Sequence, residues 1–95
     1  MKREIVLEQL KGAKNELFRK YPIHALGLFG SVARGDDTLE SDIDILVEFN
    51  RPVGFEVVDL ADEIESILKH RIDLISRKAI KATVWPYIEN DLVYV

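Results

Sequence analysis

Cysteine is absent from the 95 residues of this chain, and so are long apolar runs. Without cysteine there is no disulfide framework and no thiolate zinc site. No stretch approaches the roughly 20 apolar residues that a membrane-spanning helix needs, which excludes such a helix. The first residues are charged and amphipathic and do not resemble a secretory leader, so we expect a cytoplasmic location.

Basic residues are also fewer than acidic ones. The chain has 13 lysines and arginines against 17 aspartates and glutamates, and its net charge is -4. The basic residues are scattered, and no run of them predicts the basic face that binds phosphate backbones, so direct nucleic-acid binding is disfavoured. The length suits one domain, over residues 1–95, with a single core.

Apolar side chains recur at helical spacing in two segments, residues 4–20 and residues 55–69. A shorter helix is expected over residues 85–90, where Pro86 suits the first turn. Trp85 beside it is better explained by packing than by stacking on a nucleobase. The second long helix carries acidic residues for which a solvated face is the simpler interpretation and a docking site for a basic partner the alternative: Asp59, Asp62, Glu63 and Glu65.

Short apolar runs predict strands between these helices. Three are expected, over residues 25–29, 42–49 and 71–76, and a fourth edge strand is possible over residues 92–95. A short helix over residues 31–34 and a polar loop separate the first strand from the second. The sequence therefore predicts an α/β or α+β domain with helices packed against a small mixed sheet.

Two aspartates, Asp42 and Asp44, stand at the start of the second expected strand. Side chains two apart in a strand leave the same face, roughly 6.5–7 Å from each other along the chain. Carboxylate oxygens are the ligands that Mg²⁺ prefers. Taken alone, the pair fits a solvated strand face. Aspartate is nevertheless a poor strand former, and two at the start of an apolar strand indicate a specific role, such as metal binding.

The first expected strand ends at a Gly-Ser pair, Gly30 and Ser31. Glycine allows the backbone to turn and to approach a ligand closely. The amides that follow, together with the serine hydroxyl, can receive phosphate oxygens at a helix N-terminus. A strand-ending turn with an ordinary helix cap is the alternative.

A third carboxylate, Asp73, lies between apolar residues in the expected strand 71–76. If that strand lies beside the second one, three carboxylates meet, and the third can ligate a metal and accept a proton from an attacking hydroxyl. The alternative is an edge charge paired with Arg71 or Arg77.

The combined pattern, Gly30-Ser31 followed after ten residues by Asp42-x-Asp44, resembles the nucleotidyltransferase motif of the DNA polymerase β-like superfamily. The small size and the flanking segments resemble its minimal nucleotidyltransferases, called MNT proteins. The likeness extends over nearly the whole chain and includes the stretches at residues 52–55, 71–75 and 93–95. It implies the polymerase β-like nucleotidyltransferase fold.

The resemblance also implies roles for individual residues. Gly30 and Ser31 would hold the triphosphate of ATP, and Arg34 would contact phosphate or support the structure. The ligands of two Mg²⁺ ions would be Asp42, Asp44 and Asp73. Asp73 would also help to activate the acceptor.

Family members of this kind are antitoxins of HEPN-domain toxins, and some transfer AMP to a tyrosine of the toxin and silence its RNase. The resemblance therefore implies a Mg²⁺-dependent protein adenylyltransferase with ATP and a HEPN toxin as partners. The first alternative is a non-catalytic antitoxin that neutralises the toxin by contact alone. A weaker one is an enzyme that modifies a small molecule.

Overall fold

A four-stranded mixed sheet lies at the centre of the computed structural model, which describes residues 1–95. The strand order is β3-β2-β1-β4. β1 pairs antiparallel with both β2 and β4, whereas β2 pairs parallel with β3. The strands are β1 (Ile23–Phe29), β2 (Ile43–Phe49), β3 (Ile72–Ser76) and β4 (Val93–Tyr94).

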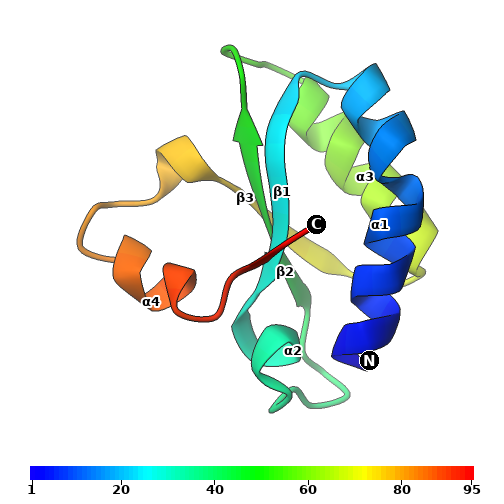
Figure 1. Ribbon diagram of the computed structural model, residues 1–95, viewed down its shortest axis with the longest axis vertical. Coiled ribbons are helices and arrows are strands. Elements are labelled where there is room, and N and C mark those ends of the chain that lie inside the picture. The colour runs from blue at the N-terminus through cyan, green and yellow to red at the C-terminus, as the bar shows by residue number, and fades with distance from the viewer.

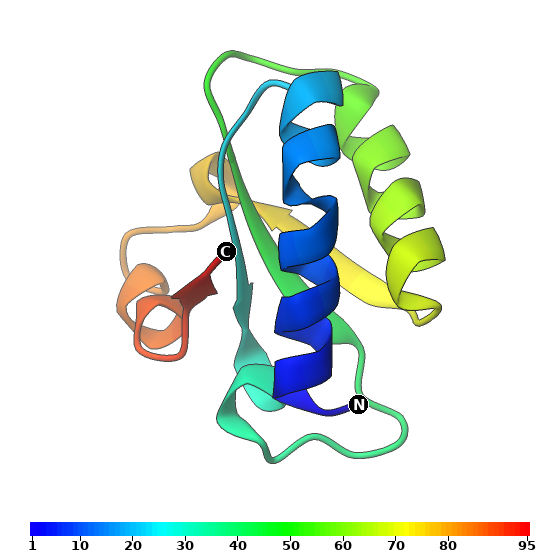
Figure 2. The same cartoon turned by 45° about the vertical axis from the view of Figure 1, so that its right-hand side comes forward.

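The two long helices lie side by side on one face of this sheet, and the C-terminal segment covers part of the other (Figures 1 and 2). The parallel pair β2–β3 requires a crossover, which α3 provides. The helices are α1 (Arg3–Lys20), α2 (Gly30–Arg34), α3 (Glu56–Leu68) and α4 (Trp85–Glu89), with a 3-10 turn, η1 (Arg77–Ala79).

Most of the apolar core lies between the sheet and the two long helices. It joins fourteen buried residues, among them Leu10, Ile45 and Ile64. The opposite face holds a much smaller cluster of three buried residues, Phe29, Leu46 and Ile88. One face of the sheet is therefore sealed, and the other stays open wherever the C-terminal segment does not reach.

The predicted order of elements is confirmed, and the mixed sheet flanked by helices confirms the predicted fold class. The possible fourth strand exists as β4, and Pro86 lies in the first turn of α4 as expected. Strand β1 begins two residues earlier than predicted, at Ile23, because β2 extends to Phe49 and pairs with it there. No helix of the chain has the length and apolar character required to cross a bilayer.

Candidate active site

The turn from β1 into α2 brings the backbone against an aspartate of the neighbouring strand. Gly30 has φ 78°, in the left-handed region that favours glycine. Phe29 pairs with Asp44 across the antiparallel ladder. A Cβ atom at Gly30 would lie 3.0 Å from Cγ of Asp44 and would collide with its Oδ2. Glycine is therefore required here both by backbone conformation and by the Asp44 carboxylate.

The parallel ladder brings Asp73 beside Asp44. The two residues are register partners in the β2–β3 pair, so their side chains leave the same face of the sheet. That face is the open one, because Leu46, two residues further along β2, belongs to the small cluster beneath α4. Asp44 is half-buried and Asp73 is exposed. Residues 29 positions apart in the chain thus meet through strand register.

Asp42 lies one residue before β2, which begins at Ile43 and not at Asp42 as predicted. Its Oδ1 atom accepts a hydrogen bond from Nε of Arg71 at 3.2 Å. The Ile43 amide donates to the Arg71 carbonyl, which fixes the two chain segments next to each other. The alternative for Asp73, an edge charge paired with Arg71 or Arg77, does not occur: Arg71 is engaged by Asp42, and Arg77 stacks over Trp85.

The electrostatics of the site concentrate on Asp44. Burial raises the pKa of this carboxyl, and the negative charges of Asp73 and Asp42 raise it further, while Arg34 acts in the opposite direction. Three like charges therefore interact at one end of the sheet without a compensating cation in direct contact with Asp44. Such an arrangement is stabilised by a bound cation.

These residues fit a magnesium ion that is completed by substrate. No group of three or more acidic or histidine side chains in the chain is arranged to enclose an ion by itself. Mg²⁺ in nucleotide-dependent enzymes takes one or two carboxylates and fills its other positions with water and substrate phosphates. The register-paired Asp44 and Asp73, with Asp42 beside them, supply carboxylates of this kind on the open face.

Arg34, at the end of α2, is held by two carboxylates. Its Nε atom donates to Asp36 at 3.1 Å, and its Nη1 atom donates to Asp91 at 2.8 Å. Asp91 precedes β4, so its bond to Arg34 ties the C-terminal segment to α2, the helix that begins at Gly30. Because both side-chain contacts go to aspartates, the structural role predicted for Arg34 has more support than the phosphate contact.

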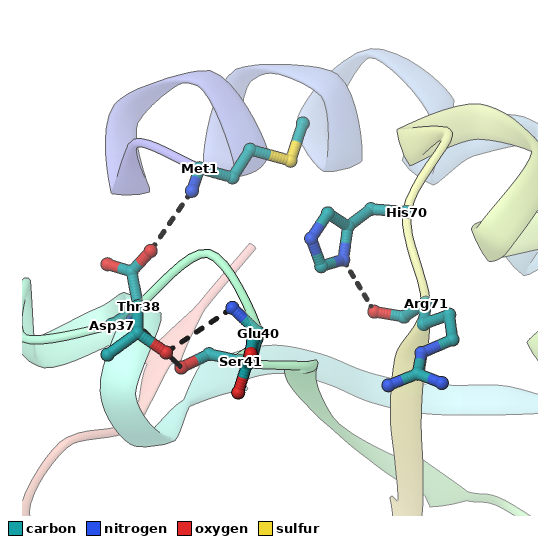
Figure 3. Close-up of polar contacts among 7 residues, drawn as sticks. All are labelled: Met1, Asp37, Thr38, Glu40, Ser41, His70 and Arg71. Atoms are coloured by element: carbon teal, nitrogen blue, oxygen red, sulfur yellow. Dashed lines mark hydrogen bonds and ion pairs between the residues drawn. The ribbon is translucent and has the colours of Figure 1, made fainter.

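The loop between α2 and β2 is organised by short polar contacts (Figure 3). The Thr38 amide donates a hydrogen bond to the Ser41 hydroxyl at 2.9 Å, and the Glu40 amide donates to the Thr38 hydroxyl. The α-amino group of Met1 lies 3.0 Å from Oδ2 of Asp37. These bonds set the path of the chain into Asp42.

The remaining predicted site residue, Ser31, follows Gly30 in the first turn of α2 and is half-exposed. The structure thus gathers all the predicted residues at one end of the β1–β2–β3 sheet. The sequence interpretation missed the partners that hold them, Arg71 for Asp42 and Asp91 for Arg34. Isolated charged residues give no signal of pairing across 29 and 57 positions of chain.

Comparison with known proteins identifies the relatives of this chain. The profile of the family described as "Nucleotidyltransferase domain" matches residues 10–95. A provisionally named protein adenylyltransferase from Methanocaldococcus jannaschii is 45% identical over 94 residues, which cover 95% of this chain and 94% of the relative. The protein adenylyltransferase MntA from Thermococcus cleftensis is 32% identical over 87 residues, covering 90% and 88%.

Solved structures share the fold. A minimal nucleotidyltransferase superposes with a TM-score of 0.81 at 24% identity, covering 98% of this chain and 95% of its own. A complex of the tri-AMPylated HEPN toxin of Shewanella oneidensis with its MNT antitoxin contains a chain that matches with a TM-score of 0.65 at 22% identity, covering 93% and 68%. At these identities the likeness concerns the fold alone.

Proposed function

Because this chain belongs to the nucleotidyltransferase domain family, in its minimal nucleotidyltransferase group, we propose that it transfers AMP from ATP to a tyrosine hydroxyl of a HEPN-domain toxin and so acts as that toxin's antitoxin. The whole of residues 1–95 then acts as one minimal nucleotidyltransferase domain. The observation that carries the proposal is the register pairing of Asp44 with Asp73 beside the Gly30 turn.

Relatives support the choice of donor and acceptor. Proteins 45% and 32% identical to this chain are named as protein adenylyltransferases. The fold also occurs in a complex of a tri-AMPylated HEPN toxin with an MNT antitoxin. A protein acceptor therefore has direct parallels, whereas a small-molecule acceptor has none among these relatives.

In the reaction we propose, the acceptor oxygen forms a bond to the α-phosphorus of ATP and the α–β phosphoanhydride bond breaks. Pyrophosphate leaves, and the hydroxyl proton passes to the exposed Asp73 carboxylate. Gly30 and Ser31 hold the triphosphate, the glycine by allowing close approach and the serine through its hydroxyl and amide.

Magnesium would be held by Asp42, Asp44 and Asp73, and when bound it neutralises charge on the attacking and leaving oxygens. Of these residues, Asp44 has the most fixed position, because the Gly30 backbone lies against its carboxylate. Asp42 accepts from Arg71 through Oδ1, which leaves its Oδ2 atom for the ion.

The test is transfer of label from α-phosphate-labelled ATP, with Mg²⁺, to the HEPN-domain protein encoded nearest to the gene of this chain. We expect labelled toxin with the wild type and at least about a hundredfold less with the double variant Asp42→Asn, Asp44→Asn, since each removes charge from the reacting centre. The matched control, Asp59→Asn with Asp62→Asn, removes the same charge from exposed positions of α3 and should retain transfer.

A folded Asp42→Asn, Asp44→Asn variant that still protects cells from the toxin as well as the wild type does would contradict antitoxin action by transfer. That outcome would favour neutralisation by contact alone. Circular dichroism and size-exclusion chromatography of the variant establish whether it is folded.

A further inference from the structure

A cavity of about 420 Å³ opens at the end of the β2–β3 pair opposite to the aspartates. It lies where β2 and β3 end, between the loop after β2 and the turn η1. Its apolar lining comes from Phe49, Val53 and Val57. This volume lies within the range of sites for small ligands or for a few side chains.

The cavity is basic, although the chain as a whole is acidic. Three cationic side chains line it, Arg51, Arg77 and Lys78, against one carboxylate, Glu48. With Glu56, whose carboxylate bonds to the lining residues Arg51 and Gly54, the excess is one positive charge, which contrasts with the net charge of -4 for the whole chain. The cavity therefore attracts an anion locally where most of the surface does not.

Two of the three cations have no carboxylate partner. Arg51 is paired with Glu56 at 3.2 Å. Arg77 instead stacks its guanidinium over the ring of Trp85, 3.8 Å from the centroid, which orients the group but leaves its hydrogen-bond donors free. Lys78 is exposed and makes no ion pair. An arginine held in place with unused donors is a preorganised site for a carboxylate.

Strand β3 connects the aspartate site to this cavity along a free edge. It is the outermost strand of the sheet, with β2 on one side only. The single side-chain acceptor bonded to its main chain is Glu65, whose Oε2 atom lies 3.2 Å from the Ile72 amide. From Asp73 to Ser76 the edge rises over three residues, or about 10 Å, and Arg77 follows in η1. Main-chain groups on such an edge can pair with an added strand.

We propose that the free edge of β3 and the basic cavity form a docking groove for an extended, acidic and apolar segment of the protein acceptor. A segment paired with β3 places the acceptor hydroxyl beside Asp73 and a glutamate or aspartate, three or four residues away, at Arg77 and Lys78. The inference rests on the proposed transfer to a protein, and it adds a preference for acceptor sequence that the aspartate site itself cannot supply.

A peptide explains the lining better than a polyanion does. Part of the cavity lining is apolar, at Phe49, Val53 and Val57, which suits an aliphatic side chain next to an acidic one. Binding of nucleic acid depends on many basic contacts to phosphates, whereas only Arg77 and Lys78 are free here, on a chain with net charge -4.

The experiment measures binding in the absence of Mg²⁺ and ATP, so that it does not depend on catalysis. The probe is a fluorescent peptide with one tyrosine and with glutamate and valine three and four residues from it. We expect saturable anisotropy with the wild type and at least about tenfold weaker binding with Arg77→Gln, Lys78→Gln, since two charge-assisted bonds are lost.

The matched control is Lys11→Gln with Arg19→Gln, which removes the same charge from exposed positions of α1 and should bind the peptide as the wild type does. A second peptide with lysine in place of glutamate should bind at least about tenfold more weakly. A third, N-methylated at alternate amides, should also lose affinity, because it cannot form a ladder with β3.

Three results would overturn the proposal: equal binding by the lysine peptide, unchanged binding by the Arg77→Gln, Lys78→Gln variant, or displacement of the peptide by ATP or by a short RNA. The last would assign the cavity to a nucleotide or to nucleic acid. Failure of the proposed function is a separate result, in which the peptide binds with the expected charge dependence but no AMP reaches a protein.

Discussion

At the scale of single residues, the site depends on one glycine and one register pair. Asp44 has its backbone in the centre of the sheet and its carboxylate against the Gly30 main chain. The glycine, the serine and the first two aspartates could be selected from the sequence by their spacing, and Asp73 by its place in an apolar strand; the roles of all five stay predictions. Arg71 and Asp91 could not be selected, because their partners are defined only by the folded chain.

A substitution at Gly30 should therefore affect both stability and chemistry. Gly30→Ala places a methyl group in the left-handed region and against the Asp44 carboxylate, so we expect AMP transfer to be lost and stability to fall by more than about 1–3 kcal/mol. Gly35→Ala is the matched control, because Gly35 has φ 82° but open space around its Cβ position.

The control should lose only the backbone contribution, about 1 kcal/mol in urea unfolding, and should keep its transfer activity. Equal activity of the two alanine variants would show that the approach of Gly30 to Asp44 does not matter for the reaction.

At the scale of elements, α1 and α3 are joined across their surfaces by a polar contact as well as by the core. Glu63 accepts hydrogen bonds from the Lys20 ammonium at 2.9 Å and from the Tyr21 hydroxyl at 2.8 Å. Glu65, in the last turn of α3, accepts a hydrogen bond from the Ile72 amide at the start of β3. The sequence interpretation treated these acids as a solvated face, because helical periodicity locates a side chain on a face but does not name its partner on another helix.

The contact of Glu63 with Tyr21 and Lys20 predicts that stability depends on pH in both the alkaline and the acid range. Burial and then the bond to Glu63 raise the pKa of Tyr21 from 10.0 to about 12, so its contribution is complete below pH 10 and is lost as pH rises through 12. The bond to Lys20 lowers the pKa of Glu63 below 4.5, so its contribution is complete above that pH and is lost as pH falls through the lowered value.

Glu63→Gln should reduce the free energy of unfolding by about 1 kcal/mol near neutral pH and flatten the acid limb of the profile. Tyrosine absorbance should show the most basic titration moving from about 12 toward 10.0. Glu16→Gln, which removes an exposed carboxylate 3.7 Å from Arg19, should change neither profile. A wild-type titration curve in Glu63→Gln would disprove the role of this contact.

At the scale of the whole molecule, the two faces of the sheet are unequal. Fourteen buried residues form the cluster on the side of α1 and α3, and three form the cluster on the side of the C-terminal segment. The family and the enzyme class were predicted from the sequence and are confirmed by the profile match and by close relatives. Alternation along β2 places Leu46 on the face of Asp44, but the size of the cluster on that face was not predictable, because it depends on where Ile88 of the C-terminal segment packs.

This imbalance predicts that the C-terminal segment opens on its own. Ile88→Ala should speed amide exchange over residues 77–95 and leave the exchange of α1 and α3 unchanged, because the small cluster is lost locally. Leu10→Ala should instead lower the protection of the whole chain by about 2–5 kcal/mol. Uniform loss of protection in Ile88→Ala would mean that the two clusters unfold as one unit.

The pairing of Asp44 with Asp73 has a consequence for folding quality. Side chains alternate along a strand, so a slip of β3 by a single position would turn Asp73 toward α3, into the core that Ile72 and Leu74 contact. Such a molecule would bury an unpaired charge and would also lose its third carboxylate from the open face. Under the proposed mechanism, only molecules with the β3 register seen here carry all three carboxylates on one face, so the fraction of molecules active in AMP transfer would measure how much of a refolded sample has this register.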